Sequence, residues 1–268
     1  MVRLREMLRL SSLVYTRRER SGAWSRVAEY GGSGFRAGLW VHSSTSDAVL
    51  SIRGTAGPSD ALQDARLLFG REPRAWRHGR AALDQARRAI PARGRLALTG
   101  HSIGGAFASA LGAEQQVPTV TFNAPGMLEA LRRSYGAAPC PAWVRPGHRQ
   151  LIDISIRADW IRLLSGPPLG ARCLIGPARS TALRGAGPRA LAEALRCGVR
   201  REGLSFVTDS IRNHAVSAFR PFAEAGRGLA WDMNIRRVLS FDAGMSATPS
   251  ACAVFPRVGS HEGSRAMT

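Results

Sequence analysis

The chain has 268 residues, of which 44% are hydrophobic, and this length favours one α/β domain with a sizeable core over two independent domains. Its 38 basic residues exceed its 19 acidic ones, giving a formal net charge of +19, and every basic residue is an arginine. The arginines are scattered, so their number reflects a compositional bias and predicts no nucleic-acid partner. A basic surface that touches anionic membranes remains an alternative to a generally solvated surface.

The four cysteines are too few and too dispersed for a disulfide scaffold, and none forms a CxxC pair. Buried reduced thiols are favoured, with one bridge in an exported protein as the alternative; the cysteines are Cys140, Cys173, Cys197 and Cys252. Charge interrupts the first ten residues too often for a signal peptide, and no apolar run is long enough to span a membrane. We expect a soluble protein that is cytoplasmic or exported by a signal-independent route.

The first part of the chain alternates between helical and strand-like patterns. Apolar residues recur at helical spacing over residues 3–15 and predict an amphipathic helix. Strands are predicted at Val27–Tyr30, Phe35–His42 and Ala48–Ile52, the first two joined by a turn at residues 31–34. Further helices are predicted from Pro58 to Leu68 and over residues 75–90, before Pro91.

The same alternation continues to about residue 223. Strands are predicted at residues 95–99, 118–122 and 151–156, and helices at about 106–113, 127–134, 188–197 and 203–223. The stretches 136–147 and 165–188 are rich in Gly or Pro, and we expect the second to lie outside the core. The pattern predicts a mostly parallel sheet flanked by helices, in one domain over residues 1–242 with a flexible tail at 243–268.

The most informative motif is G-x-S-x-G at Gly100-His101-Ser102-Ile103-Gly104, between a predicted buried strand and an Ala-rich helix. This is the pattern of a nucleophile elbow, in which a serine sits on a tight strand-to-helix turn. Glycine is needed on both sides because neighbouring chain approaches too closely for side chains. Ser102 is therefore the predicted nucleophile, and the amide of Ile103 is a predicted donor to an oxyanion.

A serine nucleophile needs a base and an orienting acid, which follow it along the chain in the order acid, then histidine. Asp159 is the predicted acid because it comes just after the predicted strand at residues 151–156, at the edge where the elbow opens. Asp153 is its rival but falls within that strand.

His214 is the predicted general base, since Asn213 before it can cap a helix and leave the imidazole at its mouth. The other late histidine, His261, lies in the predicted tail. The remaining histidines either neighbour the nucleophile, break the chain order or have no evident partner; they are His101, His148, His78 and His42.

A second oxyanion donor is expected on a loop after an earlier buried strand. Arg53-Gly54-Thr55, which ends the strand Ala48–Ile52, fits this place because Gly54 permits a tight turn and Thr55 offers an amide and a hydroxyl. No metal and no cofactor are required by this constellation.

Several stretches match the motifs of one known family. Ala48–Thr55 resembles a strand that ends in F-R-G-T, with Ile52 in place of Phe, and Gly100–Gly105 resembles G-H-S-L-G-G. Weaker matches occur at residues 60–64 and at His78-Gly79, and Thr121–Gly126 resembles T-F-G-x-P in a bacterial F-N-A-P-G form. With the intervals of 57 and 55 residues that separate Ser102, Asp159 and His214, the chain resembles the class 3 (fungal-type) lipases from about residue 5 to 222.

This resemblance implies an α/β-hydrolase fold, a metal-free Ser-Asp-His mechanism and lipid ester substrates, as in a triacylglycerol lipase or a phospholipase A. It also implies a lid at residues 56–74, although that segment mixes charged and apolar side chains. A short-chain esterase or thioesterase, and a non-catalytic α/β-hydrolase-like binding module, are the alternative functions.

Overall fold

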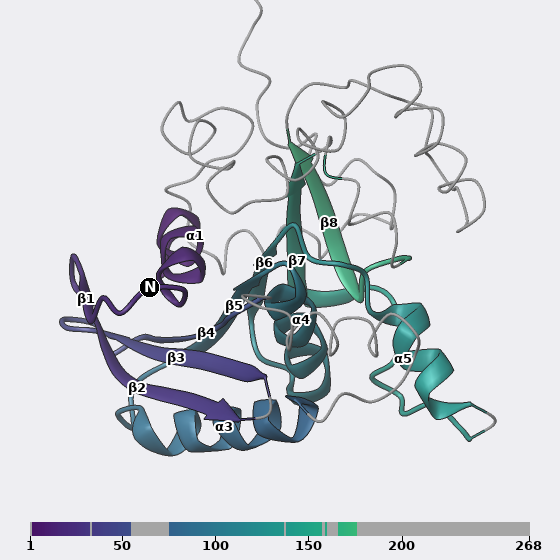
Figure 1. Cartoon of the computed structure of the whole chain (residues 1–268), viewed down its shortest axis with the longest axis horizontal. Helices are drawn as coiled ribbons and strands as arrows, with labels where there is room; N and C mark the ends of the chain where they lie inside the picture. Colours follow the sequence, from purple (N-terminus) through teal and green to yellow (C-terminus); the bar gives the residue numbers. More distant parts are fainter. Residues whose placement is uncertain are drawn as a thin grey trace, which may run out of the picture.

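A single eight-stranded sheet forms the centre of the computed structural model, which describes residues 2–32, 34–54, 75–136, 138–156, 159 and 166–175. The strands lie side by side in chain order, from β1 to β8 (Figure 1). They are β1 (Arg20–Ser21), β2 (Trp24–Gly32), β3 (Phe35–His42), β4 (Ala48–Ile52), β5 (Leu96–His101), β6 (Thr119–Phe122), β7 (His148–Ile156) and β8 (Gly170–Ile175). Strands β1 to β4 pair antiparallel, and β4 to β8 pair parallel.

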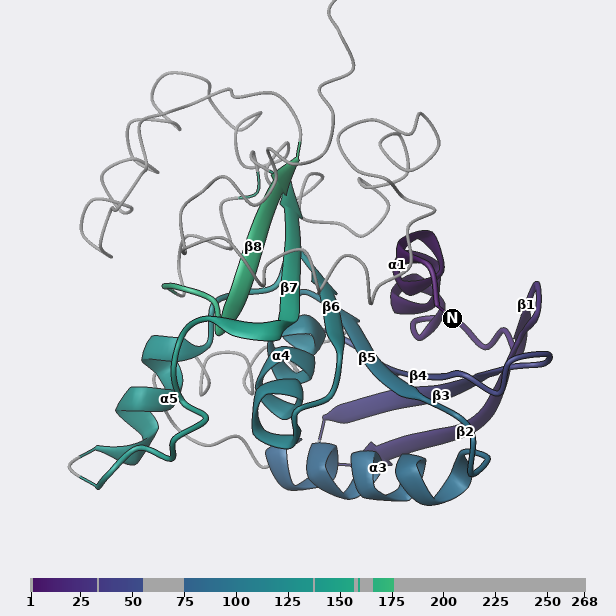
Figure 2. The same ribbon diagram turned by 180° about the vertical axis from the view of Figure 1, so that it is seen from behind.

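Helices cover both faces of the sheet, as Figures 1 and 2 show from opposite sides. They are α1 (Leu4–Leu13), α3 (Ala75–Ala89), α4 (Ile103–Gln115) and α5 (Leu128–Tyr135). One face packs against α3, α4 and α5 through a core that includes Leu39, Leu50 and Leu98. The other face packs against α1 and includes the fully buried Trp40 and Phe122.

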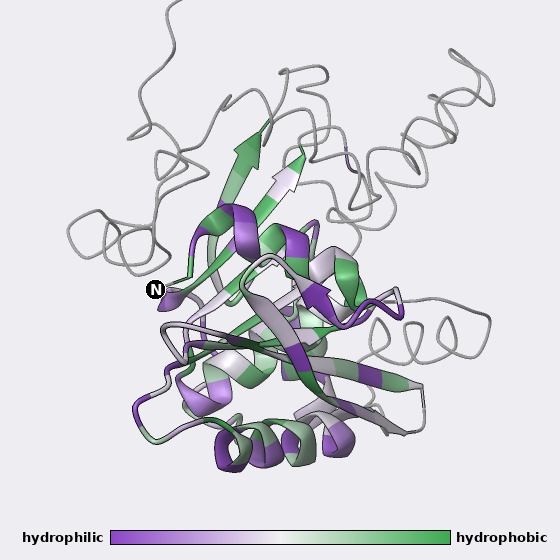
Figure 3. Cartoon of the chain, turned by 90° about the vertical axis from the view of Figure 1, so that its left-hand side faces the viewer, coloured by the Kyte–Doolittle hydropathy of each residue, from purple (hydrophilic) through white to green (hydrophobic). Residues whose placement is uncertain are grey.

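The distribution of apolar residues along the sequence explains this layering. In α1 and α3, apolar and polar residues alternate around the helix, so one side packs on the sheet and the other meets water (Figure 3). The central strands β4 and β6 are buried at every position, which is expected for parallel strands covered on both faces. The predicted mostly parallel α/β architecture is therefore confirmed.

The structure corrects the prediction for residues 165–188. Part of this stretch is strand β8, which pairs with β7 at the edge of the sheet instead of leaving the core. The strand was hard to recognise because it starts at Gly170 and carries a charged residue, Arg172, in its middle; the charge is accommodated by an ion pair with Asp153 of β7. In addition, β7 begins at His148, three residues before the predicted start.

Several predicted segments lie outside the described residues, namely the helices at 58–68, 188–197 and 203–223, the lid at 56–74 and the tail at 243–268.

Of the cysteines within the described residues, Cys140 is exposed with a free thiol and Cys173 is disulfide-bonded. This finding favours one bridge over four reduced thiols. Within the same part of the chain, none of the helices has the length and apolar character needed to cross a bilayer.

An ion pair joins the starts of the two central parallel strands. Arg95, just before β5, donates from Nε and Nη2 to the two carboxylate oxygens of Asp47, just before β4, at 2.7 and 2.9 Å. Burial raises the pKa of the Asp47 carboxyl, but its hydrogen bonds, including those from Arg95, outweigh burial and lower that pKa from 3.8 to about 2. The charged form of Asp47 therefore stabilises the fold.

We expect Asp47→Asn to lower the free energy of unfolding by about 1–2 kcal/mol near pH 6. Because the pKa of Asp47 falls on folding, this difference should be complete above pH 4 and disappear as the pH drops toward 2. Urea denaturation followed by circular dichroism between pH 2 and pH 6 measures it. Asp84→Asn is the matched control, since Asp84 is an exposed carboxylate 4.0 Å from Arg87; an equal pH dependence in both variants would contradict the assignment.

Candidate active site

Ser102 occupies the turn between β5 and α4, as the motif predicts. Its backbone has φ 56° and ψ −134°, a conformation that non-glycine residues rarely adopt and that costs about 1–3 kcal/mol. Such strain persists only where the surroundings impose it. The conformation ends the strand and starts the helix without a loop, leaving the Ser102 side chain partly exposed at the carboxyl edge of the sheet.

The two elbow glycines allow this turn. A Cβ at Gly100 would lie 2.5 Å from the carbonyl carbon of Gly104, and a Cβ at Gly104 would lie 2.6 Å from the carbonyl carbon of Arg53. Real Cβ atoms do not come so close to backbone, so α4 can start against the exit of β4 only with glycine at both positions. Glycine at positions 100 and 104 therefore permits the close packing of β4, β5 and α4.

The backbone groups around the nucleophile have different hydrogen-bond partners. The Ser102 N–H donates to the carbonyl oxygen of Phe122 at 3.1 Å, and the Ser102 carbonyl accepts the first hydrogen bond of α4, from Ala106, at 3.1 Å. Ile103 is the first residue of α4, where amides have no carbonyl partner within the helix. An amide in this place can donate to an anion, and the partial positive charge of the helix N-terminus favours such binding.

The exit of β4 lies directly beside the nucleophile. A Cβ at Gly54 would be 3.3 Å from the Cβ of Ser102, and the Gly54 N–H donates to the hydroxyl of Tyr15 at 2.9 Å. The Gly54 amide is therefore occupied, and Thr55 is the next residue that can supply a donor. Thr55 itself lies outside the described residues.

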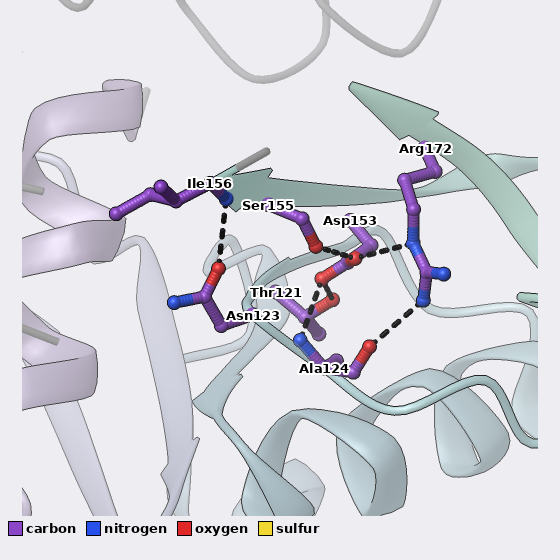
Figure 4. A network of polar contacts seen from close by, with 7 residues as sticks. All are labelled: Thr121, Asn123, Ala124, Asp153, Ser155, Ile156 and Arg172. Atoms are coloured by element: carbon purple, nitrogen blue, oxygen red, sulfur yellow. Dashed lines mark hydrogen bonds and ion pairs between the residues drawn. The ribbon is translucent and has the colours of Figure 1, made fainter. Parts of the chain in front are cut away.

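The two candidate acids have different surroundings. Asp153 lies within β7 and is 3% exposed, and its oxygens accept hydrogen bonds from Thr121, Ala124, Ser155 and Arg172 (Figure 4). Asp159 lies just beyond the end of β7 at the carboxyl edge of the sheet and is fully buried, and its N–H donates to Ile156 O at 3.0 Å. Asp153 is therefore part of the polar packing between β6, β7 and β8, whereas Asp159 lies beyond the end of β7.

Each histidine of the described residues has a defined neighbour. The Nδ1 of His101 lies 3.4 Å from the Tyr15 hydroxyl, on the α1 side of the sheet. His42 lies edge-on to Trp24, and the imidazole of His78 covers Gly32. His148 is buried and bonds the carbonyl of Trp143 at 2.7 Å, and burial lowers its pKa. His214 and His261 lie outside the described residues.

Four neighbouring parallel strands thus bring their carboxyl ends to one edge, where ligands bind in open α/β sheets. From β4 to β7 these ends carry Gly54, Ser102, Asn123 and Asp159. A strained serine between a parallel strand and a helix, in a sheet of this topology, defines the α/β-hydrolase class of protein.

Comparison with known proteins narrows this class. The Tle-like phospholipase domain family, described as phospholipase-like, matches residues 7–140, which is half of the chain. The chain belongs to this family. The predicted relationship to lipid-ester hydrolases is thereby confirmed.

One curated relative is the extracellular phospholipase A1 of Serratia liquefaciens, which is 32% identical over 111 residues, or 41% of this chain. The match spans about a third of that relative's length, 34%. Among solved structures, the chain is similar to Lip2 lipase from Yarrowia lipolytica, at 16% identity and a TM-score of 0.44, over 65% of this chain and 79% of that one. A lipase from Rhizopus microsporus var. chinensis has 13% identity and a TM-score of 0.44, with 65% and 75% covered.

Three groups near the candidate site carried no signal that identified them in the sequence. Tyr15 follows α1 and reaches Gly54 across 39 positions of sequence. Asn123 and Arg172 meet in one polar network only because β6, β7 and β8 are neighbours (Figure 4). The motif match at Thr121–Gly126 includes Asn123 but does not reveal the residue that its side chain contacts.

We expect Gly104→Ala to prevent correct formation of the elbow, since the added methyl group would meet the backbone of Ile52, Arg53 and Gly54. Expression of folded protein should fall sharply, or the thermal midpoint should drop by more than 5 °C. The matched control is Gly31→Ala in β2, where the nearest atom is 3.5 Å from the added Cβ and the change should be nearly neutral. Equal stability of the two variants, measured by calorimetry, would contradict the steric account.

Proposed function

We propose that this protein is a serine hydrolase that cleaves the acyl esters of phospholipids. The observation that carries the proposal is Ser102 held at positive φ between β5 and α4, with the β4 exit beside it. Membership of a phospholipase-like family supports the chemistry, and the Serratia phospholipase A1 supports the substrate class. A phospholipase A is therefore preferred over a triacylglycerol lipase.

In the proposed mechanism Ser102 Oγ attacks the ester carbonyl while His214 accepts its proton, and Asp159 orients the imidazole. The tetrahedral intermediate collapses as His214 gives the proton to the leaving alcohol, so an acyl-serine forms and the lysolipid departs. Water, deprotonated by His214, then attacks the acyl-serine. The second tetrahedral intermediate collapses as His214 returns the proton to Ser102 Oγ, which releases the fatty acid and free Ser102.

Two observations support the assignment of His214 and Asp159. The other histidines before residue 176 contact Tyr15, Trp24, Gly32 or Trp143, which leaves the two later ones as candidates for the base. His214 keeps the order nucleophile, acid, base. Asp159 is buried at the carboxyl edge, where a carboxylate can orient an imidazole away from water.

For the oxyanion, the proposal combines the amide of Ile103 with Thr55. The bond from the Gly54 N–H to Tyr15 removes the preceding amide from consideration and supports Thr55 as the second donor. A donor placed where the oxygen becomes negative accelerates the reaction by about 10²–10³-fold.

We further propose that the partner is an anionic membrane surface rather than a nucleic acid. Six exposed arginines lie in or near α1, namely Arg3, Arg5, Arg9, Arg17, Arg18 and Arg20. Two of them, Arg17 and Arg18, closely follow Tyr15 in the chain, and the Tyr15 hydroxyl contacts Gly54 beside the nucleophile. Each basic side chain near an anionic surface contributes about 1 kcal/mol of attraction, which salt weakens.

We expect Ser102→Ala to lower hydrolysis of vesicles of phosphatidylglycerol and phosphatidylethanolamine by at least about 10³-fold, because the nucleophile is lost. Ser109→Ala, on the same helix and partly buried, is the matched control and should retain full activity. Fatty acid release measured by mass spectrometry tests both, with trioleoylglycerol emulsion and p-nitrophenyl butyrate as competing substrates.

Full activity of Ser102→Ala would overturn the hydrolase assignment. A wild-type preference for the emulsion would favour a triacylglycerol lipase, and a preference for the soluble ester would favour a short-chain esterase. If wild-type protein bound the vesicles without cleaving any of the three substrates, a binding module would be the better description.

The Thr55 assignment makes a separate prediction. Thr55→Val keeps the shape of the side chain but removes its hydroxyl, and it should lower kcat by about 10²-fold with little change in KM. Thr55→Ser keeps the hydroxyl and should stay within about five-fold of wild type. If Thr55→Val and Thr55→Ser have equal kcat on the phospholipid vesicles, the hydroxyl is not an oxyanion donor.

A further inference from the structure

The segment after β6 contacts both sides of the candidate site. Phe122 accepts the Ser102 N–H at 3.1 Å, which ties the segment to the nucleophile. The next residue, Asn123, accepts the Ile156 N–H on its side-chain Oδ1 at 2.8 Å (Figure 4). The backbone N–H of Asn123 also donates to Ile154 O at 2.9 Å. Adjacent residues therefore hold the elbow on one strand and the end of β7 on the other.

Ile156 links the Asn123 side chain to the backbone of Asp159 through two hydrogen bonds. Its N–H is held by Asn123 Oδ1, and its carbonyl oxygen accepts the Asp159 N–H at 3.0 Å. The Asn123 side chain is thus connected to the proposed acid through a single residue, Ile156. A shift of Asn123 would move the end of β7, and with it the backbone of Asp159.

The backbone of Asn123 explains why this residue type is present. Asn123 is fully buried and has φ +49°, in the left-handed region that glycine, asparagine and aspartate enter most easily. The class 3 lipase motif T-F-G-x-P resembled by this stretch has glycine here. Glycine would satisfy the backbone but could not accept a hydrogen bond from Ile156, so asparagine adds a contact.

A buried ion pair fixes the residue that follows. Asp153 Oδ1 accepts the Ala124 N–H at 3.0 Å, while Arg172 Nη2 donates to the Ala124 carbonyl at 2.8 Å. Arg172 Nε donates to Asp153 Oδ2 at 2.9 Å, so the two side chains enclose both polar groups of Ala124 (Figure 4). Asp153 is 3% exposed and the Arg172 side chain 14% exposed, which leaves little competition from water.

We propose that Asn123 is a positioning residue which sets the place of Asp159 relative to Ser102, and that the Asp153–Arg172 pair holds Asn123 through Ala124. The catalytic part of this proposal rests on the proposed function, since it takes Asp159 as the acid. A displacement of about 1 Å at a reacting group can cost about 10²-fold in rate. The expected loss therefore appears in kcat and leaves substrate binding almost unchanged.

Three forms of the protein separate the side-chain acceptor from the backbone conformation. Asn123→Gly keeps access to positive φ and loses the acceptor, whereas Asn123→Asp keeps both. We expect Asn123→Gly to lower kcat on phospholipid vesicles by about 10–100-fold with KM within two-fold. Asn123→Asp should stay within about five-fold of wild-type kcat, because it keeps the acceptor as well as the backbone conformation.

Hydrogen exchange gives a readout that does not depend on catalysis. Loss of the acceptor should raise the exchange rate of the Ile156 amide at least ten-fold in Asn123→Gly, with Asn123→Asp close to wild type. Amides of β4 and β5 serve as internal controls, because these strands are paired with each other within the sheet. Unchanged thermal midpoints would show that the variants are folded.

The outcomes distinguish the two proposals. If Asn123→Gly has wild-type kcat while Ser102→Ala is inactive, the positioning role is overturned and the hydrolase assignment stands. Equal losses in Asn123→Gly and Asn123→Asp would also overturn the positioning role. If Ser102→Ala remains active, the proposed function fails, and faster exchange at Ile156 in Asn123→Gly then still supports the structural link from Asn123 to the end of β7.

Discussion

The closest backbone approach at the site, between α4 and the exit of β4, is the constraint on which the other contacts depend. Gly104 lies so near Ile52, Arg53 and Gly54 that no Cβ fits between them. This approach places Ser102 beside Gly54, and Gly54 in turn meets the hydroxyl of Tyr15. A single backbone approach therefore links the nucleophile, the proposed oxyanion loop and the N-terminal helix. The strain at Ser102 follows from it, since a relaxed turn would carry α4 away from β4.

The sequence predicted the parts of the site that depend on local chain geometry. The elbow is such a part, because strand, glycines, serine and helix occupy one continuous stretch. Burial also made the central strands recognisable, as every residue of β4 and β6 is enclosed. The strand β8 was missed for the opposite reason: Arg172 is tolerated there only through Asp153, which is 19 positions earlier. Periodicity in one segment cannot reveal a charge that is neutralised by another segment.

The same distinction explains how Asp159 and Asp153 compare. Both are buried carboxylates close to the end of β7, so hydrophobicity and exposure do not separate them. Their partners do, because Asp153 is enclosed by hydrogen bonds from β6, β7 and β8. Asp153 thus acts in the framework beneath the site, and its rival occupies the edge where the elbow opens. The position of Asp153 within a predicted strand already favoured Asp159 over Asp153. The donors that surround Asp153 could be identified only once the pairing of β6, β7 and β8 was known.

The arginine-only composition acquires a physical meaning in this fold. A high positive charge alone would suggest a polyanion-binding surface, yet several arginines act as planar connectors between elements of the fold. Arg95 bridges two strand starts through both oxygens of Asp47, and Arg80 holds Glu114 through Nε and Nη2 at 3.0 and 2.7 Å. Arg172 divides its guanidinium between a carboxylate and a backbone carbonyl. A lysine ammonium has no rigid fork and could not reproduce this shared geometry, so replacing Arg172 by lysine would keep the charge and lose the connection on which the position of Ala124 depends.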